Sequence, residues 1–183
     1  MHILLHACCG PCSIYPIKSL QEQGHKIRGY FYNPNIHPYI EYGKRRDGFL
    51  EYAQKIEVPT IIDEGYELDE FLRNVSFREG DRCRVCYAQR LRKAAQIALK
   101  GDFDAYTTTL LVSPRQKHEL IKEIGTAIGQ EMGIPFYYQD YRPGYSQSVQ
   151  VSKDENMYRQ QYCGCIYSER DRYYKKKNAE DGK

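Results

Sequence analysis

The seven cysteines of this chain fall into three tight groups. Cysteines that serve only packing tend to scatter as single buried residues, whereas a closely spaced pair can turn both thiolates toward one metal ion or cluster. The groups are Cys8-Cys9-Gly10-Pro11-Cys12, Cys83-Arg84-Val85-Cys86 and Cys163-Gly164-Cys165. Their spacing predicts a protein built around a metal.

The first two groups could hold either zinc or an iron–sulfur cluster. Thiolates from Cys8, Cys9, Cys83 and Cys86 would satisfy both. Structural zinc usually draws on two CxxC pairs, whereas one pair here is adjacent in sequence. Adjacent cysteines point in different directions, which favours a multi-atom cluster or two neighbouring metals over one compact ion. Spacing alone does not decide, although it favours the cluster.

Two other interpretations of the cysteines stay open. The pair formed by Cys9 and Cys12 opens a predicted helix, and a helix N-terminus lowers a thiol pKa, as in thioredoxin-like dithiols. That interpretation leaves Cys8 and the middle pair without a role. Cys163 and Cys165, separated by one glycine, could close a small strained and reducible disulfide ring, or could simply be packing thiols.

A carboxylate stands next to the middle pair. Asp81 precedes Cys83 by two residues, where it could ligate a second metal or move protons. Such a residue more often caps the helix that follows it. The histidines His6, His37 and His118 are isolated in sequence, so core or surface positions are expected for them rather than metal ligation.

Length and composition set further limits. A chain of 183 residues can bury a core as one domain without disulfides. Its apolar opening is too short for a signal peptide, and no later stretch approaches the roughly 20 apolar residues of a membrane span. We therefore expect a cytoplasmic protein with no membrane partner. Thiols are kept reduced there, which favours metal binding or redox catalysis over structural bridges.

Charge leaves a nucleic-acid partner open. The formal net charge is only +3, and solvated helix faces with a basic tail would explain it. The 18 tyrosines, however, supply rings that can stack on unpaired bases. Basic residues gather at Lys44-Arg45-Arg46, at Arg82, Arg84, Arg90, Arg92 and Lys93, and from Arg170 to Lys177.

The elements that must position the cysteines alternate along the chain. Apolar runs predict strands over residues 2–7, 26–32, 58–63, 105–110 and 134–138. Helical periodicity predicts helices over residues 13–23, 38–55, 68–74, 83–100, 116–132 and 153–161. Ser113-Pro114 looks like the N-cap and first position of the fifth of these helices.

This alternation predicts a single-domain α/β fold with a doubly wound parallel sheet. The α/β core would cover residues 1–139, and residues 140–183 would form a C-terminal extension that carries Cys163-Gly164-Cys165 and a basic tail. Ligands of such sheets bind beyond the carboxyl ends of the strands. Three segments should meet there: Cys8-Cys9, Asn33-Pro34-Asn35 and Thr107-Thr108-Thr109.

Six segments, which together span nearly the whole chain, carry a family resemblance. They are Cys8-Cys9-Gly10-Pro11-Cys12, Tyr32-Asn33-Pro34-Asn35-Ile36-His37-Pro38, Glu41-Tyr42-x-x-Arg45, Arg82-Cys83-x-x-Cys86-Tyr87-x-x-Arg90-Leu91, Thr108-Thr109-Leu110-x-x-Ser113-Pro114 and Tyr158-Arg159-Gln160-x-Tyr162-Cys163-Gly164-Cys165-x-Tyr167-Ser168. This ordered set resembles the QueH family of epoxyqueuosine reductases.

The resemblance implies reduction of epoxyqueuosine to queuosine at the wobble position of tRNA, the last step of queuosine biosynthesis. It also implies a Rossmann-like fold of the adenine nucleotide alpha hydrolase type, a [4Fe-4S] cluster and no cobalamin. By position, Cys8, Cys9, Cys83 and Cys86 would be the cluster ligands, with Cys12 as a neighbour. Cys163 and Cys165 would form a redox-active disulfide.

The implied reaction consumes two electrons and two protons, whereas a [4Fe-4S] cluster ordinarily passes one electron at a time. A second electron store is therefore expected. It could be the dithiol of Cys163 and Cys165, or a mononuclear metal such as iron held by Cys9 and Asp81, which would also act as a Lewis acid on the epoxide oxygen. An external electron donor must feed the site.

The implied substrate is the anticodon loop of a tRNA that carries epoxyqueuosine. Its bases can be splayed out and held by tyrosines and arginines. The candidate contacts are Arg45, Arg82, Arg90, Lys175, Lys176 and Lys177.

Two rival functions remain. An iron–sulfur enzyme that transfers sulfur to tRNA would need a glycine- and serine-rich loop after the first strand, but cysteines occupy that position. A zinc-stabilised RNA-binding module is the non-enzymatic alternative.

Overall fold

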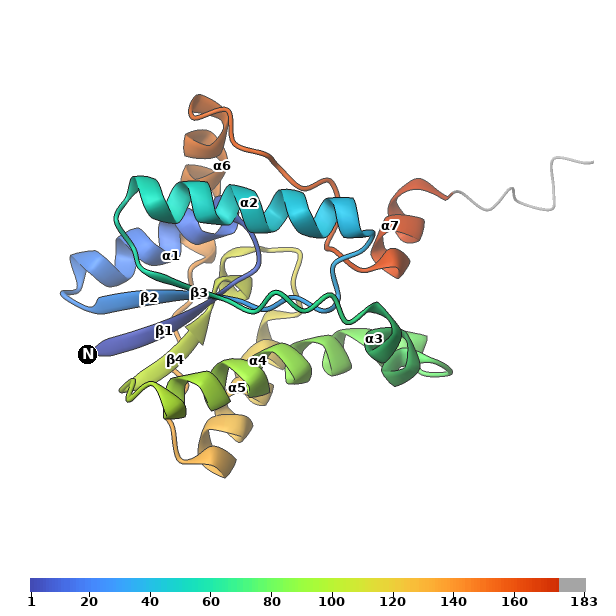
Figure 1. The fold of residues 1–183 in the computed structure, drawn as a ribbon, viewed down its shortest axis with the longest axis horizontal. Helices are drawn as coiled ribbons and strands as arrows, with labels where there is room; N and C mark the ends of the chain where they lie inside the picture. The colour runs from blue at the N-terminus through green and yellow to red at the C-terminus, as the bar shows by residue number, and fades with distance from the viewer. Residues whose placement is uncertain (175–183) are drawn as a thin grey trace, which may run out of the picture.

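Four parallel strands form the centre of the molecule (Figure 1). The computed structural model describes residues 1–174, so the predicted RNA contacts Lys175, Lys176 and Lys177 lie outside the described residues. The strands are β1 (His2–Ala7), β2 (Lys26–Phe31), β3 (Thr60–Ile62) and β4 (Ala105–Thr108), in the order β3-β2-β1-β4.

Strand β1 occupies the middle of this sheet, and its run of Ile3, Leu4 and Leu5 is apolar. Its residues from Ile3 to Ala7 are fully buried, as expected for a parallel strand covered on both faces. Leu4 pairs with Arg28 on one side and with Tyr106 on the other. The strand therefore delivers the residue after Ala7 to the centre of the sheet's carboxyl edge.

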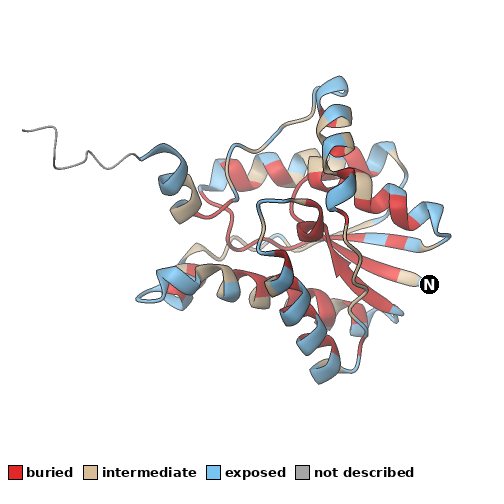
Figure 2. Cartoon of the chain, turned by 180° about the vertical axis from the view of Figure 1, so that it is seen from behind, coloured by how far each residue is buried: buried red, intermediate tan, exposed pale blue. Residues whose placement is uncertain are grey.

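Helices cover both faces of the sheet. Helices α1 (Gly10–Glu22) and α2 (Tyr39–Lys55) lie on one face, and α4 (Arg82–Lys100) and α5 (His118–Met132) lie on the other (Figure 1). The buried residues of these helices lie on the sides that face the sheet (Figure 2). The predicted α/β, Rossmann-like fold with a doubly wound parallel sheet is confirmed.

The remaining elements are short. Helix α3 (Leu68–Val75) precedes α4, and α6 (Tyr145–Asp154) and α7 (Ile166–Tyr173) belong to the C-terminal part of the chain. Three 3₁₀ turns connect the larger elements: η1 (Glu79–Asp81), η2 (Thr109–Val112) and η3 (Arg142–Gly144). No helix within residues 1–174 is both long and apolar enough to cross a bilayer.

The predicted fifth strand over residues 134–138 is wrong. The structure has only an isolated parallel bridge there, between Tyr106 and Phe136. The pairing consists of two hydrogen bonds, from Tyr106 N to Pro135 O at 3.1 Å and from Tyr137 N to Tyr106 O at 2.8 Å. Because Pro135 has no N–H to donate, the ladder cannot extend toward Ile134.

The helix predictions need four corrections. The helix predicted over residues 153–161 is found at α6, eight residues earlier at its start, and α7 was not predicted. Ser113-Pro114 does not begin a helix: Ser113 Oγ accepts a hydrogen bond from Arg115 N at 3.3 Å in a turn, and α5 begins at His118. Helix α1 begins at Gly10 rather than residue 13 and so includes Cys12.

Candidate metal centre

The first cysteine group lies where the strand order reverses. The chain runs outward from β1 through β2 to β3 and then returns to place β4 on the other side of β1. The crevice beyond β1 and β4 is the usual ligand site of such sheets. Cys8 follows β1, Thr109 follows β4, and Cys8 N donates a hydrogen bond to Thr109 Oγ1 at 3.1 Å.

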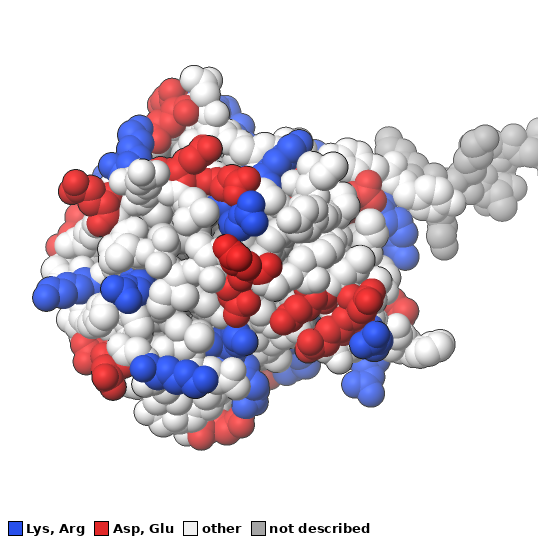
Figure 3. Space-filling model, viewed as in Figure 1, with Lys and Arg blue, Asp and Glu red and all other residues white. Residues whose placement is uncertain are grey.

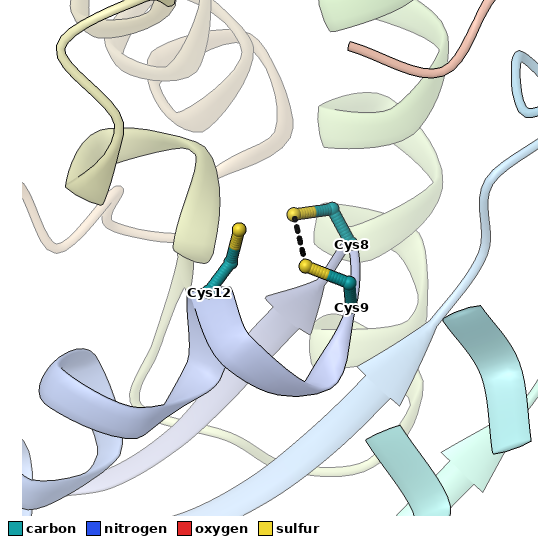
Figure 4. A group of neighbouring side chains, drawn as sticks. All are labelled: Cys8, Cys9 and Cys12. Carbon is teal, nitrogen blue, oxygen red and sulfur yellow. Dashed lines mark hydrogen bonds between the residues drawn. The ribbon is translucent and has the colours of Figure 1, made fainter. Parts of the chain in front are cut away.

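Three buried sulfurs converge in this crevice. The sulfur atoms of Cys8, Cys9 and Cys12 all lie within 4.8 Å of one another (Figure 4). Cys9 is the N-cap of α1 in extended conformation, and Pro11 occupies the first turn, where a missing N–H costs nothing. The strand-to-helix turn thus directs three thiols into one space, the only such group of metal-type ligands among residues 1–174.

Polar donors surround these sulfurs. Thr109 Oγ1 lies 3.3 Å from Cys8 Sγ, and Gln160 Nε2 lies 3.2 Å from Cys12 Sγ. Such donors stabilise thiolates and orient metal ligands. Hydrogen bonds from Cys12 and Cys9 hold the pKa of Cys8 well below its usual range, whereas burial raises the pKa of Cys9. The group therefore favours one thiolate, and further ionisation needs a bound cation.

The second cysteine pair begins helix α4. Cys83 is partly exposed and Cys86 is buried, and their three-residue spacing places them on one side of the helix. Burial raises the pKa of Cys86 to about 12. Neither residue belongs to the group of three sulfurs within 4.8 Å. The structure therefore brings Cys8 and Cys9 together with Cys12, and leaves Cys83 and Cys86 as separate neighbours on α4.

Arg90 stands one turn after Cys86 and is only 2% exposed. Its Nη2 donates to Cys86 Sγ at 3.0 Å, and its Nη1 donates to Asn33 Oδ1 at 3.2 Å. Among the described residues no carboxylate lies within ion-pair distance of it. A buried guanidinium needs a compensating anion. The acidic group beside Arg90 is the thiol of a cysteine, which becomes an anion as a thiolate.

Arg45 is also 2% exposed, and it holds the C-terminal segment. Its Nε pairs with Glu41 Oε1 at 2.7 Å, while its Nη1 and Nη2 donate to the carbonyls of Cys163 and Tyr162 at 2.8 and 2.9 Å. Tyr158 donates to the other oxygen of Glu41. Contact of Arg45 and Arg90 with RNA stays a prediction: both side chains are buried, and Arg45 lines the same pocket as Cys8 and Cys12.

The third cysteine group packs against the loop after β2. His37 N donates to Gly164 O at 2.9 Å, and Gly164 has a φ of +146°. Cys163 is exposed, Cys165 is buried, and both carry free thiols. Cys163 lines a pocket of about 110 Å³ together with Cys8 and Cys12. The structure therefore brings the first and third groups to one pocket.

Gln116 faces Cys163 in a fixed orientation. Tyr87 Oη accepts from Lys117 N at 3.3 Å and donates to Gln116 Oε1 at 2.6 Å, so the amide nitrogen of Gln116 must point the other way. That nitrogen lies 3.3 Å from Cys163 Sγ. No role was predicted for Gln116 from the sequence, and Gln160 entered only as part of a family segment, because a glutamine in a loop carries no pattern that indicates a thiol partner.

Asp81 occupies the N-cap position of α4 and is exposed. The alternative role of Asp81 as a capping side chain is not supported, since its carboxylate makes no capping hydrogen bond there. Within residues 1–174 its carboxylate also has no ion-pair partner. Of the histidines, His6 is fully buried and burial lowers its pKa to about 4, which agrees with the expected core position.

Relatives of known name match almost the whole of this chain. A sequence model described as epoxyqueuosine reductase QueH matches residues 3–171. A curated QueH protein from Dehalococcoides mccartyi is 38% identical over 173 residues, which cover 94% of this chain and 95% of the relative. The chain belongs to the epoxyqueuosine reductase QueH family. A QueH relative from Thermotoga maritima is 34% identical, covering 91% of this chain and 89% of the relative.

The likeness to solved structures concerns only the fold of this QueH-family chain. A predicted subunit of a tRNA methyltransferase from Methanocaldococcus jannaschii aligns with a TM-score of 0.59 at 11% identity. The alignment covers 84% of this chain and 74% of that structure.

The residues of this QueH-family chain fit an anionic, sulfur-rich group. Three thiols converge, amide and hydroxyl donors face their sulfurs, and Arg90 supplies a buried positive charge. Asn35 is 1% exposed, yet both polar atoms of its amide lack a partner within the described residues. This amide lies beside Gly164 and not among the residues that line the pocket, so its unpaired atoms carry no argument about the group at the thiols.

Proposed function

We propose that this chain is a cytoplasmic epoxyqueuosine reductase that converts epoxyqueuosine to queuosine in tRNA, the last step of queuosine biosynthesis, within a single catalytic domain. Membership of the QueH family supports this function. One observation carries this proposal. Three buried thiols converge where the strand order of the sheet reverses, and Arg90, which pairs with no carboxylate among the described residues, supplies a buried positive charge. That arrangement suits an electron-transfer group better than an ordinary structural metal.

The cofactor of the proposed reaction is a [4Fe-4S] cluster, without cobalamin. Cys8, Cys9, Cys83 and Cys86 remain the proposed ligand set, and the position of Cys12 makes it the alternative to one of them. Such a cluster supplies electrons one at a time. The chain's own contribution is to exclude water from the sulfurs, to orient them through Thr109 and Gln160, and to balance their charge through Arg90.

The reaction converts an epoxide to an alkene, releases the oxygen as water, and consumes two electrons and two protons. The dithiol of Cys163 and Cys165 would give up two electrons and two protons as it closes to a disulfide. Cys163 lines the same pocket as Cys8, which supports this role as a relay. An external electron donor would reopen the disulfide after each turnover.

Asp81 is proposed to hold a second metal, a mononuclear iron, that polarises the epoxide oxygen. Its exposed carboxylate without an ion-pair partner in the described residues supports this role. Replacement of Asp81 by alanine should leave the visible absorbance of the cluster unchanged and abolish turnover. Replacement of Glu51 by alanine, also an exposed acid, is the matched control and should retain activity. Retained turnover in the Asp81 variant would remove Asp81 from the mechanism.

The first test of the function is the ultraviolet–visible spectrum of protein isolated or reconstituted without oxygen, with iron, sulfide and zinc analysis. We expect a broad band near 400 nm that bleaches with dithionite, followed by reduction of epoxyqueuosine in tRNA. Zinc without iron or sulfide would contradict the reductase and favour the zinc-stabilised RNA-binding module. ATP hydrolysis that depends on tRNA would instead favour the sulfur-transfer enzyme.

A further inference from the structure

Phe77 is the most exposed large apolar side chain among the described residues, at 99%. Its backbone has a φ of +59°, a left-handed conformation that bulky residues rarely adopt. The chain nevertheless fixes it there: Ser76 Oγ donates to Leu72 O at 2.8 Å to end α3, and Phe77 N donates to Glu79 Oε1 at 3.2 Å. The aromatic ring is thus held in solvent by a backbone conformation that costs free energy. Packing within the fold does not explain why the ring is exposed.

The loop that carries Phe77 is joined to helix α7. Arg82 donates to Glu79 O in this loop at 2.9 Å and pairs with Asp171 of α7 at 2.6 Å. Its guanidinium also lies over the ring of Tyr167, 5.7 Å from the centroid. The loop and α7 stand at the same end of the molecule (Figure 1). Each adjoins a cysteine in sequence, since Arg82 precedes Cys83 and Cys165 precedes α7.

Aromatic rings and arginines alternate across this junction. Arg170 also lies over the ring of Tyr167, 5.7 Å from its centroid, and Tyr173 is 56% exposed at the end of α7. We call these residues the rim: Phe77, Arg78, Arg82, Tyr167, Arg170 and Tyr173. Acidic and basic side chains are mixed over the face seen in Figure 3, so recognition here would depend on local ring and guanidinium pairs rather than on a broad positive field.

Single-stranded RNA fits this chemistry. Unpaired bases stack on aromatic rings and on guanidinium planes, while phosphates pair with exposed arginines such as Arg78. A base-paired stem offers no such faces. We propose that the rim receives the unpaired loop of the tRNA, and that Phe77 stacks on a base beside the one that enters the cysteine pocket. This inference rests on the proposed function and adds the surface that holds the substrate.

The test measures binding of an anticodon stem-loop RNA to the reconstituted protein, with a fully paired hairpin of equal length as the comparison RNA. Phe77→Ala should weaken stem-loop binding by about ten-fold, and Phe77→Tyr should restore it, because a ring is retained. Phe77→Leu keeps an apolar side chain without a ring and should bind weakly. Leu99→Ala, which removes a 42% exposed residue at the opposite end of α4, should bind as the unmodified protein does.

Two further readouts separate this inference from the proposed function. In Phe77→Ala the cluster spectrum and the turnover at saturating RNA should stay unchanged while KM rises. Equal binding by Phe77→Ala and the unmodified protein would overturn the rim alone. Slower reduction by a protein electron donor with unchanged RNA binding would also overturn it, by assigning the surface to the donor. Failure of the unmodified protein to bind the stem-loop would overturn the proposed substrate together with the rim.

Discussion

Arg90 carries a full positive charge in the interior, and its hydrogen bonds go to a carbonyl, an amide and the sulfur of Cys86. None of these carries a permanent negative charge. In the metal-free protein the guanidinium is therefore compensated only in part, by the thiolate of Cys8, whose pKa the charge of Arg90 helps to lower, and this costs stability. When thiolates bind a metal group beside it, the same guanidinium becomes a favourable neighbour. Arg90 should therefore destabilise the metal-free protein and stabilise the protein that holds the metal group.

Replacement of Arg90 by methionine tests this dependence. The metal-free variant should be more stable than the metal-free parent, by about 1–3 kcal/mol, because a poorly compensated charge has left the core. The reconstituted variant should be less stable than the reconstituted parent, because the anionic centre has lost its counter-charge. Urea denaturation of both forms measures the two differences. Arg90→Lys retains the charge and is the control; a change of the same sign in both forms of Arg90→Met would contradict this role.

The segment that carries Cys163 and Cys165 is held by backbone contacts rather than by a hydrophobic face. Helix α7 has no buried residue of its own. The segment is fixed instead by the carbonyls that Arg45 binds and by the close approach of Gly164 to the loop after β2. An ideal Cβ at Gly164 would lie 3.2 Å from Asn35 Nδ2 and 3.3 Å from Arg45 Nη1. The anchor therefore requires glycine for both space and conformation.

Gly164→Ala should loosen this anchor by about 1–3 kcal/mol, since alanine is strained at φ +146° and its methyl group would crowd Asn35 and Arg45. The expected result is faster alkylation of the buried Cys165 by a thiol reagent. Gly80→Ala is the matched control, because its Cβ meets nothing within 4 Å. Alkylation of Cys165 at the parent rate in Gly164→Ala would show that the anchor does not depend on this glycine.

Sequence patterns predicted the elements that rest on continuous apolar runs. Strand β1 was confirmed at both ends, and helices α2 to α4 were confirmed within one residue at each end, since burial sets their periodicity. Elements after residue 139 were misplaced, because α6 and α7 bury little and their pattern is polar. The convergence of Cys8 and Cys9 at the sheet edge followed from topology. The burial of Arg45 and Arg90 did not, because an arginine among charged neighbours gives no sign of a carbonyl or thiol partner.

At the scale of the whole molecule, the formal net charge is only +3, and acidic and basic side chains are mixed over the face seen in Figure 3. A strong long-range attraction to RNA is therefore not expected. Attraction should come from a few phosphate contacts, each of which releases counterions. Lys175, Lys176 and Lys177 lie beyond the described residues and add three positive charges after α7.

RNA affinity should fall steeply as salt rises. A chain that ends at Tyr174 should show a slope of log K against log salt that is shallower by about 2, given a loss of roughly 0.7 per contact for single-stranded RNA. Affinity at low salt should fall as well, while the cluster spectrum stays unchanged. Stem-loop binding titrated over a series of salt concentrations measures both slopes. Equal slopes for the two chains would mean that the basic tail makes no phosphate contact.

The order of the cysteine groups along the chain has a consequence for biosynthesis. A ribosome makes Cys8, Cys9, Cys12, Cys83 and Cys86 before it makes the segment that Arg45 anchors. At about 5–20 residues per second, the stretch from Cys86 to Cys163 takes roughly 4–15 s to translate. During that interval the growing chain already holds the sulfurs of the centre but not the segment that closes over them. Cofactor insertion should therefore meet less obstruction during synthesis than after this segment has packed against Arg45.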